Sequence, residues 1–277
     1  MANFGDLTPD NTISGGTSGA AIGNNGDRLK VDALITASDL TQSSYDAFGR
    51  LRISSPHALF ESAFRYDEQP ELWSSLLINS GALTYNDDRC AVILSTANVV
   101  GSRAVYQTRS YFKYGPSRST QVAASFNLKG IVSGQIKRLG QYDDENGYFL
   151  ELSGSSAYFA IRSKISGTAV DTKIAQANWN VDKLDGTGES GLAIDFTKQN
   201  ILQFDYQWLG SGSVRFGFVI NGSMVICHKV DHANTLEVLY SQTATLPIRA
   251  EIIRSTSSTS TMEITCCSVI IEGESVN

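Results

Sequence analysis

The feature that most constrains this sequence is an alternation of apolar and polar residues on both sides of tight-turn signals. From residue 202 to 208 every second side chain is apolar, and the polar positions between are Gln203, Asp205 and Gln207. Apolar runs resume over residues 214–220 and, after Asn221-Gly222, over residues 224–230. A period of two gives a strand one apolar face, and Asn-Gly suits both central positions of a tight hairpin turn. The pattern predicts three consecutive antiparallel strands.

Short apolar runs of the same kind recur along most of the chain and are separated by Gly- and Ser-rich turns. They lie at residues 92–94, 105–106, 111–112, 122–126, 148–152, 157–161, 248–253 and 262–271. No convincing amphipathic helix interrupts them. Many short strands with turns between them favour an all-β fold, an antiparallel β-sandwich of the jelly-roll type.

The first residues have a different character. Residues 11–26 are rich in Gly, Ser and Asn and bury too little apolar surface to fold alone. A short alternating strand then follows, formed by Leu29, Val31, Ala33 and Ile35. We therefore expect an extended N-terminal arm over residues 1–36, carrying one strand, and a sandwich domain over residues 37–277. A lone strand needs a partner, so these four residues are the predicted docking site on a neighbouring molecule.

Charge and hydropathy exclude several classes of partner. The formal net charge is −6, which gives no overall attraction to nucleic acid or to an anionic membrane. The longest mostly apolar stretch, residues 91–100, is far shorter than the ~20 residues of a membrane helix, so no membrane insertion is expected. Residues 1–18 lack the basic and apolar regions of a secretory signal. The four cysteines form no CxxC pair, which fits synthesis in a reducing cytoplasm.

Catalytic patterns are absent from the sequence. There is no GxSxG motif, and the three histidines are in no triad order. Acidic residues gather at Asp143, Asp144 and Glu145, and this triplet is interpreted as a solvated turn. Glu151 lies on a predicted strand, as the carboxylates of jelly-roll glycosidases do, but those enzymes need a second carboxylate facing the same cleft. The sequence offers Glu151 no evident partner, so we expect no catalytic residues and no enzyme.

Two groups of potential ligands are also interpreted as structural. Cys227 and His228 are adjacent on a strand and point to opposite faces, so with His232 they make a poor metal site. Asp182, Asp185 and Glu189 lack the spacing of a calcium loop. No metal and no cofactor are predicted.

A sugar-binding face would use exposed aromatic rings. Of the three tryptophans, Trp208 is in register with the core positions of its strand. Trp179 lies in a loop-like segment, residues 175–191, and is the candidate glycan contact, but a core or interface role is favoured over it.

An ordered series of motifs resembles the structural proteins of tailed bacteriophages. It runs from residue 45 to about residue 252 and comprises YDAFGRLR at 45–52, LF at 59–60, RY at 65–66, WNVDKLDGTG at 179–188, DYQWLG at 205–210, VRFGF at 214–218, HAN at 232–234 and LPIR at 246–249. One departure is Glu189, where a proline is expected. The resemblance implies a jelly-roll virion component with no established catalytic residues to carry over.

The resemblance, the arm and the missing catalytic pattern together predict a non-enzymatic virion protein on the outside of the particle, in a fibre, neck or collar, baseplate or head decoration. It would be assembled in the host cytoplasm as a homo-oligomer, expected to be a trimer, docked through its arm onto other virion proteins. The alternative is a carbohydrate-binding module of a tail appendage that recognises a host surface glycan. A glycan-degrading enzyme is disfavoured because the carboxylate pair is not visible.

Overall fold

The computed structural model describes residues 21–24, 29–32, 45–47, 49–52, 56–116, 118–256 and 258–272. Contacts divide the chain into two units, Met1–Ser44 and Tyr45–Asn277, a boundary eight residues beyond the predicted one. In the first unit β1 (Ala21–Asn24) pairs antiparallel with β2 (Leu29–Asp32), and Val31 lies opposite Ile22. The strand expected to lack a partner therefore has one in its own unit. Ala33 and Ile35 lie outside the described residues, and docking of the arm onto a neighbour stays a prediction.

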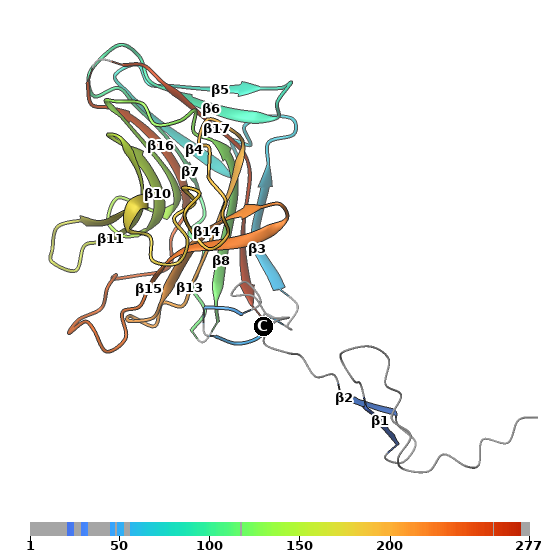
Figure 1. Cartoon of the computed structure of the whole chain (residues 1–277). Coiled ribbons are helices and arrows are strands. Elements are labelled where there is room, and N and C mark those ends of the chain that lie inside the picture. Colours follow the sequence, from blue (N-terminus) through green and yellow to red (C-terminus); the bar gives the residue numbers. More distant parts are fainter. Residues whose placement is uncertain are drawn as a thin grey trace, which may run out of the picture. The chain divides into compact units, whose positions relative to one another are not determined.

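The second unit is built from antiparallel strands and one short 3-10 helix in its described part (Figure 1). Its elements are β3 (Pro56–Ala63), β4 (Trp73–Ile78), β5 (Ala82–Asn86), β6 (Ala91–Ser95), β7 (Arg103–Thr108), β8 (Thr120–Asn127), β9 (Gln135–Tyr142), β10 (Gly147–Ser153), β11 (Ser156–Ser163), β12 (Val170–Ala175), η3 (Gln176–Asn178), β13 (Asn200–Tyr206), β14 (Val214–Ile220), β15 (Ser223–Val230), β16 (Ile248–Arg254) and β17 (Thr261–Glu272).

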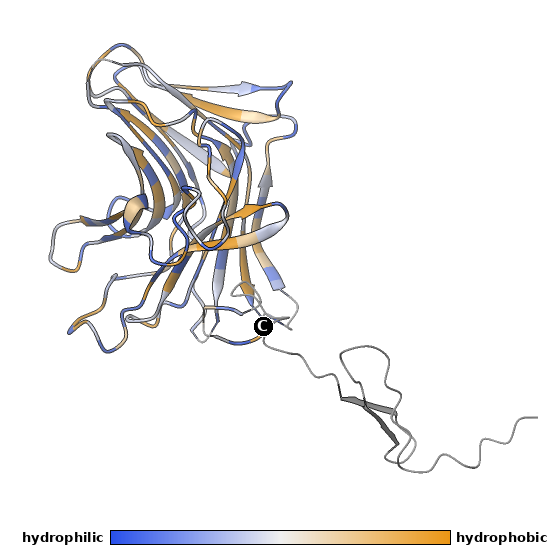
Figure 2. Ribbon diagram, in the orientation of Figure 1, coloured by the Kyte–Doolittle hydropathy of each residue, from blue (hydrophilic) through white to orange (hydrophobic). Residues whose placement is uncertain are grey.

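These strands form two sheets. The seven-stranded sheet has the order β12-β11-β10-β9-β16-β7-β4. The eight-stranded sheet follows β15-β14-β13-β8-β17-β6-β5, and β3 pairs with β17 beside this path. Both sheets contribute their inner residues to one apolar core, so the predicted antiparallel β-sandwich is confirmed. Figure 2 shows the apolar residues along the strands of both sheets.

The three strands predicted from the alternation are β13, β14 and β15, which are consecutive and antiparallel. Asn221 and Gly222 between the last two have φ of 53° and 79°. Positive φ at both positions is what a type I′ hairpin turn requires, and it explains why this dipeptide stands there.

A buried ion cluster binds the first residues of the second unit, 45–52, to the eight-stranded sheet. Asp205 on β13 is fully buried and accepts hydrogen bonds from two guanidinium groups, those of Arg52 and Arg215. Arg215 also donates to the carbonyl of Tyr45 at 2.7 Å. Three of the phage-like motifs therefore meet at one point, where they fix the entry of the chain into the sandwich.

Candidate active site

A row of five alternating charges crosses the outer face of the seven-stranded sheet. In strand order it consists of Arg103 on β7, Glu251 on β16, Arg138 on β9, Glu151 on β10 and Lys173 on β12. The register places Arg138 directly opposite Glu251 on one side and Glu151 on the other. Residues adjacent to these along the strands, such as Leu139, Leu150 and Ala250, belong to the core. Because side chains alternate along a strand, the charged row faces outward.

Neighbouring charges in the row are joined by short hydrogen bonds. Arg138 donates through Nε to Glu151 at 2.7 Å and through Nη1 to Glu251 at 3.2 Å. Lys173 reaches the other oxygen of Glu151 at 2.7 Å, and Arg103 Nε reaches the other oxygen of Glu251 at 2.5 Å. Each carboxylate is therefore held between two cations.

The two carboxylates of the row are more deeply buried than its three cations. Both glutamate side chains are 0% exposed. Burial alone would raise the pKa of the Glu151 carboxyl, but Arg138, Lys173 and Ser153 outweigh it and hold that pKa below its usual range. Glu151 is thus ionised at neutral pH. The Tyr142 hydroxyl lies 3.4 Å from Glu251 Oε2, and burial raises its pKa well above the ordinary value, so it remains protonated.

Two aromatic rings pack against each other beside this row, on the same face of the sheet. Tyr142 and Phe149 pack with ring centroids 4.6 Å apart and are fully buried although they belong to the outer face. Guanidinium groups cover them: Arg162 lies 5.2 Å from the Phe149 centroid, and Arg249 lies 5.5 Å from that of Tyr142. A side chain at Gly140 would place its Cβ 2.7 Å from the Cβ of Phe149, so glycine is required where this ring lies. The face is a packed aromatic and ionic layer.

The ionised carboxylates predict a loss of stability in acid. Opposing cations lower the pKa of Glu151, and also that of Asp171, which Arg162 binds at 2.7 Å. A carboxyl whose pKa is lower in the folded state stabilises the protein above its unfolded pKa and loses this contribution as pH falls through the folded value. We expect the melting temperature to drop steadily between about pH 5 and pH 2. Circular dichroism melts across this range test it, and a constant melting temperature would contradict it.

Trp179, the predicted glycan contact, is 2% exposed. Its ring stacks on Phe159 with centroids 4.3 Å apart, and its Nε1 donates to the carbonyl of Ile174 at 3.2 Å. The ring is a core side chain, the role favoured over a glycan contact, because the segment after η3 folds back against the sandwich. Trp179 is thus placed in the core and apart from the charged row.

The residues weighed as metal ligands are used within the fold. Cys227 lies in the core, where burial raises its pKa, whereas His228 Nδ1 accepts a hydrogen bond from the backbone N–H of Asn180. His232 stacks on Tyr240, and Asp182 accepts the backbone N–H groups of its own loop. Among the described residues, no group of three or more His, Cys, Asp or Glu side chains could hold a metal ion. No helix of the described part is long and apolar enough to cross a membrane.

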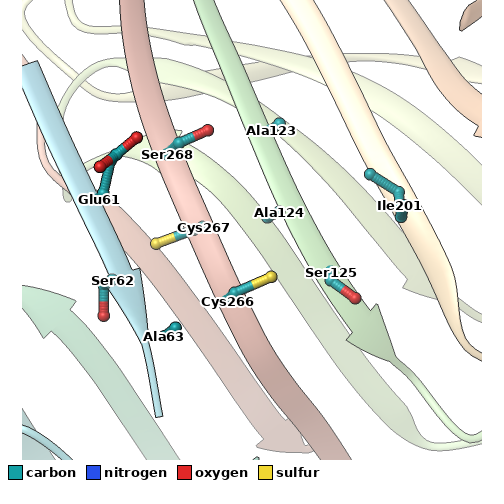
Figure 3. Close-up of a pocket in the computed structure, with 10 residues that line it drawn as sticks. All are labelled: Glu61, Ser62, Ala63, Ala123, Ala124, Ser125, Ile201, Cys266, Cys267 and Ser268. Atoms are coloured by element: carbon teal, nitrogen blue, oxygen red, sulfur yellow. The ribbon is translucent and has the colours of Figure 1, made fainter. Parts of the chain in front are cut away.

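A shallow groove of about 400 Å³ lies on the eight-stranded sheet, away from the charged row. Small side chains of β3, β8 and β17 line it, together with Ile201 of β13 and the exposed thiol of Cys266 (Figure 3). Glu61 is the one carboxylate among its lining residues. The groove therefore does not bring two carboxylates together, as the charged row does.

The sequence identified one of the two carboxylates of the row and missed the other. Glu151 was recognised on a predicted strand, whereas Glu251 is 100 positions further along the chain and was counted only within an apolar run. The available signal was the polar residue at every second position in Arg249-Ala250-Glu251, which marks an outward face. That signal does not show which distant strand lies next to the strand that carries Glu251.

Comparison with solved structures places the fold among known ones. An endo-1,3-β-glucanase from Streptomyces sioyaensis matches with a TM-score of 0.54 and 8% identity, over 79% of this chain and 97% of the enzyme. A structure from a study of endo-acting O-glycanases of the human gut microbiota matches with a TM-score of 0.52 and 12% identity, over 77% of this chain and 99% of that chain. A protein of unknown function from Shewanella oneidensis MR-1 matches with a TM-score of 0.51 and 12% identity, over 90% of this chain and 99% of that chain. No protein-family model and no curated protein matches the chain.

These comparisons correct the predicted function. The jelly-roll architecture expected of a non-enzymatic virion protein is also the architecture of a glucan hydrolase. The predictions of a bacteriophage structural role, with its fibre, neck or decoration location, and of a chain that is not an enzyme are therefore wrong. The motif resemblance itself has no match against which it can be tested. At 8–12% identity the likeness to the solved structures shows a shared fold.

Proposed function

We propose that this protein is a carbohydrate-active enzyme that hydrolyses glycosidic bonds on the outer face of its seven-stranded sheet. The observation that carries the proposal is the pair Glu151 and Glu251, two carboxylates on strands of one sheet that point to the same side. Cleavage of a glycosidic bond uses such a pair, one as the proton donor and one as the base or nucleophile. The likeness to an endo-1,3-β-glucanase makes a β-glucan the first substrate to test.

One strand, β9, separates β10 from β16, so the Cα atoms of the two glutamates lie about 10 Å apart. Both carboxylates accept hydrogen bonds from Arg138, whose side chain lies between them. Because both carboxylates are fully buried, a sugar ring reaches them only when the Arg138 side chain moves away and its hydrogen bonds to both glutamates break.

The lowered pKa of Glu151 suits it to one of the two roles. Glu151, with its lowered pKa, is the ionised group that attacks the anomeric carbon or activates water. Glu251 is then the second carboxyl group, the one that gives a proton to the leaving oxygen and regains it from the attacking water, and the Tyr142 hydroxyl lies 3.4 Å from its Oε2.

The proposal predicts that Glu151→Gln and Glu251→Gln each lower hydrolysis by about a hundredfold or more, because each removes one half of the acid and base pair. Release of reducing ends from laminarin, a β-1,3-glucan, and from mucin measures it. Glu263→Gln is the matched control, since Glu263 is also a buried carboxylate held by two cations, Arg89 and Lys129, but on the other sheet. Melting curves of all three variants separate loss of chemistry from loss of fold.

Two results would count against the proposal. One is wild-type protein that releases no reducing ends from either polysaccharide between about pH 4 and pH 8. The other is an equal loss of activity in Glu263→Gln and in the two active-site variants.

A further inference from the structure

One edge of the seven-stranded sheet is open and apolar. The strand β4 ends the sheet, and among the described strands only β7 pairs with it. Its side chains at Leu76, Leu77 and Ile78 are 49%, 47% and 37% exposed. An exposed apolar edge strand is a template for pairing with another chain, and proteins commonly guard such an edge with charges or proline. Here residues 72–86 contain no charged residue and no proline.

The pairing with β7 shows which backbone groups of β4 point to the open edge. Leu72, just before the strand, accepts the N–H of Arg109 at 2.8 Å, and this pair continues the register of the two strands. Backbone hydrogen bonds alternate in direction along a strand, so every second residue from Leu72 bonds to β7. The N–H and C=O groups of Ser75 and Leu77 therefore point away from β7. The open edge offers two donors and two acceptors.

We infer that this edge binds a second copy of the chain, with the two β4 strands antiparallel and related by a two-fold axis at Leu76. In this register Ser75 of each copy lies opposite Leu77 of the other, so all the outward donors and acceptors are used in four hydrogen bonds. The same patch is presented by both copies, as a two-fold interface requires. The outer faces of both seven-stranded sheets then lie on the same side of one continuous sheet.

The neighbouring registers fit the backbone less well. A two-fold axis at Ser75 would pair Leu77 with Trp73, but the N–H of Trp73 already donates to the carbonyl of Gln69 at 3.0 Å. An axis at Leu77 would pair Ser75 with Asn79, whose φ of 47° is not that of a strand residue. The register centred on Leu76 avoids both conflicts.

The apolar surface at this edge is large enough for a dimer. In the turn after β4, Asn79 Nδ2 donates to the carbonyl of Gly101 at 3.3 Å, which brings the turn between β6 and β7 beside the end of the strand. This turn carries Val99 and Val100, which are both exposed. Together with Leu72 and the three apolar side chains of β4, they would remove about 1,100 Å² from water in a dimer, which reaches the ~1,000 Å² of a specific interface.

Charge also favours a second copy as the occupant. Each residue of a strand that pairs with its own copy meets a residue of the same short sequence, so a charged side chain would bring like charges together. The absence of charge from residues 72–86 avoids this repulsion, although the chain as a whole has a formal charge of −6. The edge is thus compatible with itself.

Sedimentation velocity of the full chain over a range of concentrations tests the inference, and we expect a species of twice the mass of the chain. Leu76→Lys would place two ammonium groups across the axis and should weaken the dimer at least about tenfold. Val170→Lys is the matched control, because Val170 is an exposed apolar residue of β12, the strand at the opposite edge of the sheet. It should leave the dimer unchanged, and melting curves show that both variants are folded.

Cross-linking tests the register independently, in a full-length chain whose exposed Cys90 and Cys266 are replaced by Ser. Residues that face each other without hydrogen bonds in an antiparallel pair have Cα atoms about 4.5 Å apart, within the range of a disulfide. Leu76→Cys should therefore form a covalent dimer under mild oxidation. Ser75→Cys should not, because each Ser75 lies opposite Leu77 of the other copy.

Three results would overturn the inference. The first is a monomer at every concentration, which would exclude a second copy as the occupant of this edge. The second is an oligomer that Leu76→Lys and Val170→Lys weaken equally or not at all, which would transfer the contact to another surface. The third is cross-linking through Ser75→Cys in preference to Leu76→Cys.

Discussion

Asp205→Asn is expected to lower the free energy of unfolding by about 3–5 kcal/mol, because it removes the common anion of a buried ion cluster. Asp205 is 0% exposed, and Arg215 binds it through Nε at 2.7 Å and again through Nη2. Arg52 binds the same carboxylate, and its own side chain is largely buried. Without the carboxylate, Arg215 loses an anion that it binds through two nitrogens in a poorly solvated site, whereas Arg52 keeps its ion pair with Glu272.

Urea denaturation followed by fluorescence measures this change as a shift of the transition midpoint. Asp231→Asn is the control, because Asp231 is exposed and pairs with Lys229 at the surface, where such pairs contribute about 0–1 kcal/mol. A loss below about 1 kcal/mol for Asp205→Asn would show that the cluster does not hold the start of the unit in place.

Trp179→Ala is expected to destabilise the protein by about 3–5 kcal/mol, the range for removing a large aromatic side chain from a core. The ring stacks on Phe159 and lies near Phe218, with centroids 6.2 Å apart for the second pair. The substitution also leaves the carbonyl of Ile174 without its indole donor. The cavity and the lost hydrogen bond both lower the stability of the variant.

Thermal and urea unfolding of Trp179→Ala test the expectation, with Trp179→Phe as the graded variant that keeps part of the stacking. Tyr66→Ala is the surface control, because Tyr66 is 88% exposed. Unchanged stability of Trp179→Ala together with weaker polysaccharide binding would reverse the assignment and make the ring a ligand contact.

Sequence periodicity was enough to predict the architecture. The alternation over residues 202–208 became β13, and Asn221-Gly222 became a turn with positive φ at both positions. These signals are local: the face that a side chain occupies depends on its own strand, and the turn depends on two residues. For the same reason the sequence predicted an all-β sandwich without any knowledge of strand order.

The positions of Trp179 and of the charged row were decided by the tertiary structure. Trp179 follows a short 3-10 helix, and its burial depends on Phe159 and Phe218, which come from different sheets. Glu151 and Glu251 share Arg138 because β9 pairs with β10 on one side and with β16 on the other, a neighbour more than 100 residues away. Periodicity fixes the direction in which each carboxylate points, but only the pairing of distant strands decides which charges face one another.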